Sequence, residues 1–157
     1  VIRITVDNVK ETLNMKGCAL YLINEQTHEF ELAASNGLSE EYLGKGPVSV
    51  SRPVAKSLTE GPMAVYDSQE DPRVQYPEAA KKEGVVSILS VPIYVRGDVI
   101  GAMRVYTSEH WDFTLEDVNF VQALAEIAGM VIDLTRLIQG QNEYIDVLET
   151  LKETREM

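Results

Sequence analysis

The chain has 157 residues, which is enough for one domain but too short for two full hydrophobic cores. Hydrophobic residues make up 45% and charged residues 25%, the balance of a folded domain and not of a disordered segment. The formal net charge of −11 argues against binding to nucleic acid, which needs clustered Lys and Arg, and against contact with anionic membrane surfaces.

The sequence contains one cysteine, Cys18, which cannot form an internal disulfide. A reducing, cytoplasmic location is therefore expected. No apolar run approaches the roughly 20 residues that cross a bilayer, and no signal peptide is recognisable. Because the first residue is Val1 and not Met, we expect the chain to be an excerpt of a longer protein.

In the first half of the chain, apolar spacing predicts a helix over residues 1–16. Alternating patterns then predict two antiparallel strands, 18–23 and 29–35, joined by a hairpin turn. The loop 36–47 is expected to contain one helical turn capped by Ser39. A second helix is expected over residues 51–61 and a short strand over residues 62–67.

The second half begins with the stretch "DPRVQYPEAAKKEG", residues 71–84. Pro77 fits the start of a short helix and Gly84 its end, and a connection, a lid over a ligand and part of a catalytic site are the alternatives for this stretch. Two longer strands, 85–95 and 98–107, follow and are joined by Arg96-Gly97, which is a hairpin signal.

The final helix is expected to begin with a capping pattern at Thr114 and Asp117. Its apolar residues form two stripes, so both sides of the helix need a partner. The first stripe, expected to lie on the sheet, is Val118, Val121, Ala125, Ala128 and Ile132. The second stripe, the candidate dimer interface, is Phe120, Leu124, Ile127, Val131, Leu134, Ile138, Ile145 and Leu148.

The second stripe keeps the 4-3 spacing of a heptad, with β-branched Val131, Ile138 and Ile145 at a and leucine at d, interrupted at one d position by the polar Gln141. That pattern favours a parallel two-stranded coiled coil and hence a homodimer. The alternative is that the stripe packs on the N-terminal helix of the same chain. Gly140 lowers helix stability by about 1 kcal/mol relative to alanine, so a helix break at this position is a further alternative.

The phrases "AASNGLSEEYLGKGP", "DSQEDPRVQYPEAAKKEGVVSILSVPIYVRGDVIGAMRVYT" and "FTLEDVNFVQALAEIAGMVI" resemble a GAF domain over about residues 1–138. The resemblance implies an α+β, GAF/profilin-like fold: a central antiparallel sheet of five or six strands between a terminal helix pair and a layer of loops and short helices. It also implies a sensory or regulatory role in a bacterial signalling protein. Residues 139–157 would then start a signalling helix that leads to a covalently linked output domain.

Several ligand classes of the GAF family can be compared with these residues. Members that bind cyclic nucleotides carry a dispersed Asn-Lys-Phe-Asp-Glu motif, whereas "TSEHWDFTLED" lacks the Asn and the Lys and keeps only Phe113 and the acids. Members that bind bilins use a cysteine commonly followed by histidine, and residues 71–84 contain neither. Neither a cyclic nucleotide nor a covalent bilin is therefore expected.

The enzymatic branch, free methionine sulfoxide reductase, needs a nucleophilic and a resolving cysteine, and Cys18 has no second cysteine to pair with. We therefore predict no catalytic residues and no enzyme activity. His28 and His110 fall in loops without the spacing of metal ligands, so neither a metal nor haem is predicted. No cofactor is expected.

What remains is an unknown small, non-covalent ligand, or no ligand. The candidate ligand-binding residues are Tyr66, Asp67, Asp71, Arg73, Tyr76, Ser87, Arg104 and Tyr106. Arg104 is the most informative, because an arginine in an apolar strand must find an acid, solvent or an anionic ligand. Alternatively Arg104 pairs with Asp67 or Asp71, and the tyrosines only pack in the core. The competing functional hypothesis is a ligand-free dimerisation and relay module.

Overall fold

The computed structural model describes residues 15–44, 48–49 and 61–156, with the backbone alone at 48–49 and 141–156. The expected helices at 1–16 and 51–61 therefore lie outside the described residues, apart from positions 15, 16 and 61. None of the helices in the described part of the chain is both long and apolar enough to span a membrane.

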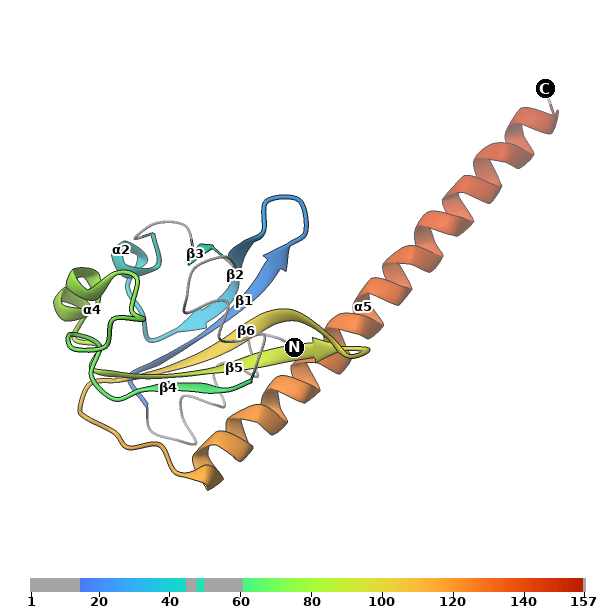
Figure 1. Cartoon of the computed structure of the whole chain (residues 1–157). Helices are drawn as coiled ribbons and strands as arrows, with labels where there is room; N and C mark the ends of the chain where they lie inside the picture. The colour runs from blue at the N-terminus through green and yellow to red at the C-terminus, as the bar shows by residue number, and fades with distance from the viewer. Residues whose placement is uncertain (1–14, 45–47, 50–60, 157) are drawn as a thin grey trace.

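Six described strands form one antiparallel sheet in the order β3-β2-β1-β6-β5-β4 (Figure 1). The strands are β1 Gly17–Asn24, β2 Glu29–Asn36, β3 Val48–Ser49, β4 Met63–Val65, β5 Ser87–Val95 and β6 Asp98–Thr107. The two hairpins predicted from alternation are β1–β2 and β5–β6, and they meet where β1 pairs with β6 at the centre of the sheet. The expected α+β fold with a central antiparallel sheet is confirmed.

Two short helices, α2 Glu40–Leu43 and α4 Pro77–Glu83, cover one face of the sheet, which we call the loop side. The Ser39 hydroxyl caps α2 by accepting a hydrogen bond from the Tyr42 main-chain N–H at 3.1 Å. Gly84 ends α4 in the left-handed conformation that favours glycine. The buried core on the loop side includes Tyr42 of α2 and Ala80 of α4.

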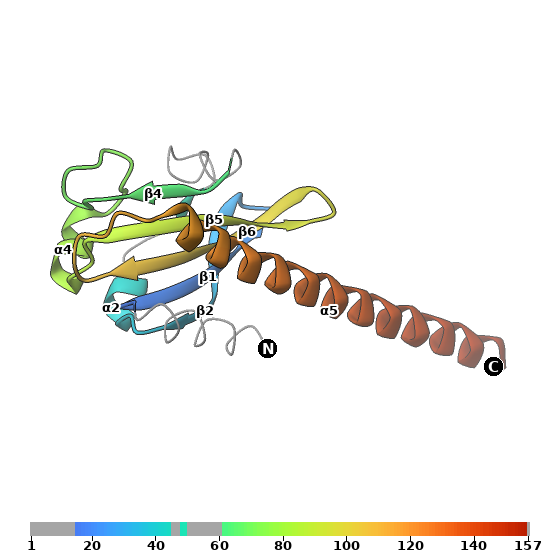
Figure 2. The same ribbon diagram turned by 90° about the horizontal axis from the view of Figure 1, so that it is seen from below.

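The long helix α5, Leu115–Glu156, covers the opposite face, which we call the helix side (Figure 2). Val121, Ala125 and Ala128 are fully buried here, against strand residues that include Leu89, Val91, Met103 and Val105. The first apolar stripe therefore lies on the sheet as predicted. The helix continues through Gly140 without a break.

Beyond the sheet, α5 projects away from the domain (Figure 1). In its second stripe, Phe120 is 38%, Ile127 49%, Leu134 58% and Ile138 50% exposed, whereas Leu124 and Val131 are half-buried. Ile145 and Leu148 belong to the helical segment whose side chains are not described. A large part of the candidate dimer interface is thus an apolar surface on an extended helix.

The β5–β6 hairpin turns at Arg96 and Gly97, which both have positive φ. Its register shifts between Ile93 and Tyr94, so that Ile100 is skipped in the pairing. As a result Ile100 packs with the helix-side core, while Ala102 and Tyr106 belong to the loop-side core. Simple alternation along residues 98–107 predicts that Ile100 shares a face with Arg104 and Tyr106, and this prediction is wrong.

Candidate ligand-binding site

Four polar residues come together on the loop-side face of the three central strands. Arg104 of β6 pairs directly with Ser90 of β5, and Tyr106 lies two residues further along β6 on the same face. Tyr21 of β1 lies diagonally across from Arg104, because it pairs with Ala102, and the Arg104 guanidinium carbon is 5.5 Å from the centre of the Tyr21 ring. We call Tyr21, Ser90, Arg104 and Tyr106 the polar cluster.

Each member of the polar cluster is more than nine-tenths buried and holds a polar atom without a hydrogen-bond partner. These atoms are the Tyr21 hydroxyl, Ser90 Oγ, Arg104 Nε and the Tyr106 hydroxyl. The ion pairs found among the described residues do not involve Arg104. The alternative that Arg104 pairs with Asp67 or Asp71 is therefore wrong, and its charge lies buried beside three hydroxyls.

The Tyr106 phenol group stays protonated. Burial raises the pKa of Tyr106 well above its usual value, and the nearby Tyr21 raises it further, against the opposing positive charge of Arg104. A hydrogen bond with Tyr21 is the smallest contribution to this pKa, and neither hydroxyl has a partner at hydrogen-bond geometry. Burial also raises the pKa of Tyr42, whose ring packs edge-on against Tyr106 with centroids 5.8 Å apart. The Tyr106 hydroxyl is thus a neutral donor.

Arg73 and Asp71 form a different arrangement, in the loop before α4. Arg73 Nη2 lies 2.6 Å from Asp71 Oδ2, and Nε donates to the same carboxylate at 2.9 Å. Nη2 also donates to the Ala64 carbonyl oxygen at 3.0 Å, on the edge strand β4. The hydrogen bond from Arg73 lowers the pKa of Asp71, although burial acts in the other direction. Arg73 therefore ties its loop to the sheet edge.

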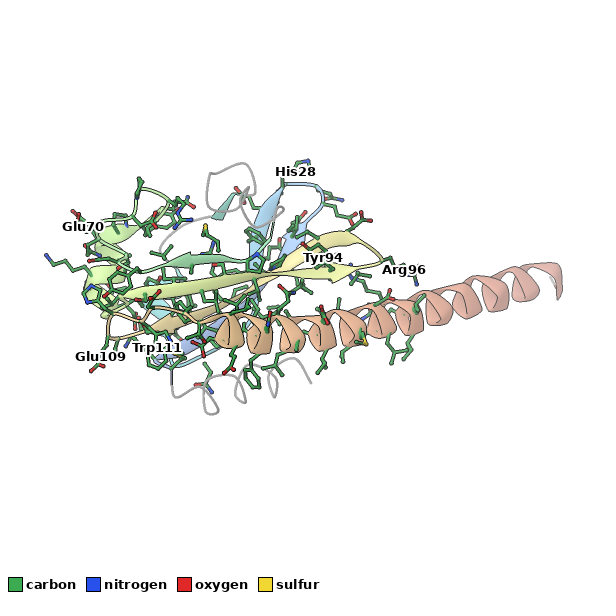
Figure 3. The ribbon with its side chains drawn as sticks, turned by 60° about the horizontal axis from the view of Figure 1, so that its bottom comes forward. His28, Glu70, Tyr94, Arg96, Glu109 and Trp111 are labelled. Carbon is green, nitrogen blue, oxygen red and sulfur yellow. The ribbon has the colours of Figure 1, made fainter. Side chains whose placement is uncertain are left out.

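Tyr66 and Asp67 lie beside His110 at the surface. Asp67 Oδ2 is 3.2 Å from His110 Nε2, and the Tyr66 ring stacks on the imidazole at a centroid distance of 5.0 Å. Hydrogen bonds from the Gln69 main chain and from His110 lower the pKa of Asp67. A pocket of about 460 Å³, lined by Tyr66, Asp67, Glu70, Asp71, Pro72 and Arg73, lies at the end of the molecule that carries Glu70 (Figure 3).

Ser87 and Tyr76 are placed apart from the polar cluster. Ser87 pairs with Thr107, and its hydroxyl donates to the Tyr66 carbonyl oxygen at 2.5 Å and accepts from the Trp111 main-chain N–H at 2.9 Å. Tyr76 precedes α4 and is half-buried, with its hydroxyl accepting from Gln75 Nε2 at 3.0 Å. Of the eight candidate residues, the structure brings only Arg104 and Tyr106 into the cluster.

The sequence predictions did not include Tyr21 and Ser90, the two other members of the cluster. Tyr21 and Ser90 lie in strands whose residues alternate between the two faces. From the sequence alone, a tyrosine or serine in such a strand is not distinguished from an ordinary core or surface residue. The signal that identifies them is their register opposite β6, which only the folded sheet supplies. Among the described residues, no group of three or more His, Cys, Asp or Glu side chains is arranged to hold a metal ion.

The sequence model of the GAF domain matches residues 1–133 of this chain. The chain belongs to the GAF domain family. A comparison with curated proteins found no match. GAF domains are generally regulatory domains.

Three solved structures illustrate how widely the GAF fold is used. A domain of a putative two-component sensor histidine kinase from Sinorhizobium meliloti 1021 has a TM-score of 0.75 at 19% identity, covering 90% of this chain and 94% of that one. The GAF domain of a phosphoenolpyruvate-protein phosphotransferase from Coxiella burnetii has a TM-score of 0.76 at 21% identity, covering 88% and 83%. Free methionine-R-sulfoxide reductase from Neisseria meningitidis, in complex with its substrate, has a TM-score of 0.72 at 20% identity, covering 87% and 78%. These likenesses show the fold alone.

Proposed function

We propose that this GAF domain is a sensory module of a cytoplasmic bacterial signal-transduction protein. It binds a small, non-covalent ligand on the loop side of the sheet and relays the bound state through α5 to an output domain. The polar cluster supports ligand binding on the loop side, because buried donors and a buried charge lower the stability of the fold when they have no partner. A regulatory role is favoured over catalysis, since Cys18, the one cysteine of the chain, is buried.

One observation carries the proposal: the two faces of β6 serve different partners. Arg104 and Tyr106 point to the loop side. Met103, just before Arg104, and Val105, between the two, pack in the helix-side core with Val121 of α5. Arg104 is paired with Ser90 of β5, the strand against which most of α5 packs. A ligand that shifts Arg104 therefore moves β6 and, through this pairing, β5 beneath the helix. Closely packed interiors transmit such displacements because they have little free space.

The exposed stripe of α5 supplies the output half of the proposal. Leu134 and Ile138 lie on a helix that extends beyond the sheet and are at least half exposed. A second copy of this chain, arranged in parallel, would cover these residues with its own identical stripe. Small changes in how α5 rests on the sheet would then alter the packing or register of the coiled coil that leads onward.

Thermal-shift screening of the chain against a broad metabolite library tests this function. A ligand that binds the folded form adds about 2.7 kcal/mol to the free energy of unfolding when its concentration is about a hundred times Kd. The melting temperature rises as a result. Hydrogen exchange with the best compound should also change in the α5 backbone beyond the sheet. A library in which no compound raises the melting temperature would contradict ligand sensing.

The second candidate is a ligand-free dimerisation and relay module. Its supporting observation is that the loop-side core is already well filled, with Tyr42, Phe30 and Ile88 all buried. This candidate predicts a stable dimer whose α5 exchange pattern no metabolite alters. The same screen therefore separates the two functions.

A further inference from the structure

The unpaired atoms of the polar cluster lie on neighbouring positions of three adjacent strands. Ser90 and Arg104 are directly paired across β5 and β6, and Tyr106 follows on the same face. Tyr21 reaches Arg104 from β1, with its ring 5.5 Å from the guanidinium carbon. The free groups comprise one guanidinium N–H and three neutral hydroxyls, all able to donate to a common acceptor.

The charge of Arg104 decides what kind of acceptor fits. A buried water could satisfy the hydroxyls, but it leaves the positive charge without compensation. The Tyr21 ring offers a cation–π contact, which does not accept the Nε hydrogen bond. A cationic ligand would be repelled and a neutral one leaves the charge unbalanced. An anion alone both balances Arg104 and accepts from the hydroxyls.

The single positive charge of the cluster favours a ligand with a single negative charge. Arg104 is the one cationic member of the cluster, so a monoanion leaves the buried site neutral, whereas a largely dianionic phosphate group would bury one excess negative charge. The planar guanidinium also matches a carboxylate, which has two oxygens and about four lone-pair positions. These positions equal the number of unpaired donor groups in the cluster.

The surroundings of the cluster indicate the rest of the ligand. The loop-side core around it consists of apolar and aromatic side chains, including Phe30, Tyr42, Met63 and Ile88. These side chains favour a short apolar substituent and offer no second cation. A surface pocket of about 270 Å³ between α2 and α4 is lined by Tyr42, which packs edge-on against Tyr106. One aromatic ring therefore links the surface to the cluster.

We propose that the ligand is a small monocarboxylate with a short apolar substituent, whose carboxylate accepts hydrogen bonds from Arg104 and from the hydroxyls of Tyr21, Ser90 and Tyr106. This inference rests on the proposed sensory function and adds the chemical class of the ligand. Rotation of the Tyr42 ring away from Tyr106 would open the way from the surface pocket. Bound carboxylate then fixes Arg104 at the centre of β6.

The test compares acids with their matched neutral amides on the whole chain. The probes are acetate, propionate and pyruvate, with acetamide, propionamide and pyruvamide at equal concentration and ionic strength, and inorganic phosphate at pH 8. At least one acid should raise the melting temperature by roughly 3–5 °C for each tenfold rise in concentration above Kd. Its amide and phosphate should give no such rise. An amide that matches its acid would overturn the proposal.

Arg104→Met gives the sharper readout, because it removes the charge and keeps most of the side-chain volume. Without ligand, this variant should melt at a higher temperature than the parent chain, since an uncompensated buried charge is gone. Its response to the acid should disappear. Arg96→Met, at the exposed hairpin turn, is the matched control and should keep the response. A lower melting temperature of Arg104→Met, or a retained response, would overturn the proposal.

Two hydroxyl deletions test the contacts with the carboxylate separately from the charge of Arg104. Ser90→Ala and Tyr106→Phe remove donors that have no protein partner, so both should fold normally and weaken acid binding by about tenfold or more. Unchanged affinity in both variants would count against the proposal. If a cation or neutral metabolite from the wider library binds instead, the ligand class fails while the sensory function stands. If no compound of any class binds, the sensory function itself fails.

Discussion

Gly129 of α5 lies directly against the main chain of Tyr94 in β5. A Cβ atom added to Gly129 would be 2.5 Å from the Tyr94 carbonyl oxygen and 3.4 Å from Cγ2 of Ile93. Tyr94 and Ile93 flank the register shift of the β5–β6 hairpin. The glycine therefore lets the helix approach the sheet where the strand changes its pairing.

Gly129→Ala should lower the stability of the domain. Alanine improves helix propensity by about 1 kcal/mol, but the clash with a carbonyl oxygen requires a shift of main-chain atoms, and overpacking of this kind costs about 1–3 kcal/mol. The net expectation is a small to moderate loss of free energy of unfolding, measured by urea denaturation.

Gly140→Ala is the matched control, because it is the same substitution in the same helix. A Cβ atom at this position meets nothing within 4 Å. The change should therefore stabilise α5 by up to about 1 kcal/mol. If both alanine variants are equally stabilising, the close approach of Gly129 to Tyr94 does not exist in solution.

Local rules predicted much of the fold. Ser39, Pro77 and Gly84 marked the short helices because their roles at helix ends depend on neighbouring residues alone. The first stripe of α5 was equally readable, since a buried helix face repeats every 3.6 residues.

The composition of the site could not be predicted, because two bulges change which residues share a face. With regular pairing from the two-residue turn, Leu89 would lie opposite Arg104 and Ser87 opposite Tyr106. The register shift between Ile93 and Tyr94 instead brings Ser90 opposite Arg104 and Ser87 opposite Thr107.

The second bulge lies in the β1–β2 hairpin. There the register shift between Leu20 and Tyr21 skips Ala33. Simple alternation would place Phe30 and Ala34 on one face, but Phe30 packs on the loop side and Ala34 on the helix side. Such one-residue shifts arise from pairing across the sheet, which local periodicity does not contain.

Ser87→Ala should destabilise the domain by about 1–3 kcal/mol, because it leaves two main-chain groups without their partner. The Ser87 hydroxyl connects the Tyr66 carbonyl oxygen with the Trp111 N–H, so it ties together the loops after β4 and β6. Urea denaturation followed by Trp111 fluorescence measures the effect. Ser108→Ala, an exposed neighbour of the second loop, should change stability by less than about 0.5 kcal/mol. Equal effects of the two variants would remove the structural role of Ser87.

Asp117→Asn should weaken the start of α5 in a pH-dependent way. Partial burial acts to raise the pKa of Asp117, but hydrogen bonds from Thr114 and from the Trp111 indole outweigh it, so that the pKa lies below its usual value. A depressed carboxyl pKa stabilises the fold above the unfolded value of about 3.9, and this stabilisation disappears as the pH falls through the folded value.

At pH 7 we therefore expect Asp117→Asn to lose about 0.5–1 kcal/mol, from the cap and from the helix dipole. The difference from the parent chain should shrink as the pH falls below about 4, in denaturation curves measured across pH. Asp112→Asn, at an exposed position before the cap, should show no such loss. A pH-independent difference for Asp117→Asn would assign the effect to packing and not to charge.

Ile138→Lys should convert the predicted dimer into a monomer. Ile138 is 50% exposed on the part of α5 that projects from the sheet, at an a position of the heptad, where two lysines would face each other across a parallel coil. Light scattering should then give a mass near 17.5 kDa in place of twice that value. Gln139→Lys adds the same charge at an exposed position outside the heptad core, so this control should remain a dimer. If Ile138→Lys is still dimeric, the exposed stripe of α5 is not the dimer interface, and relay through a coiled coil fails with it.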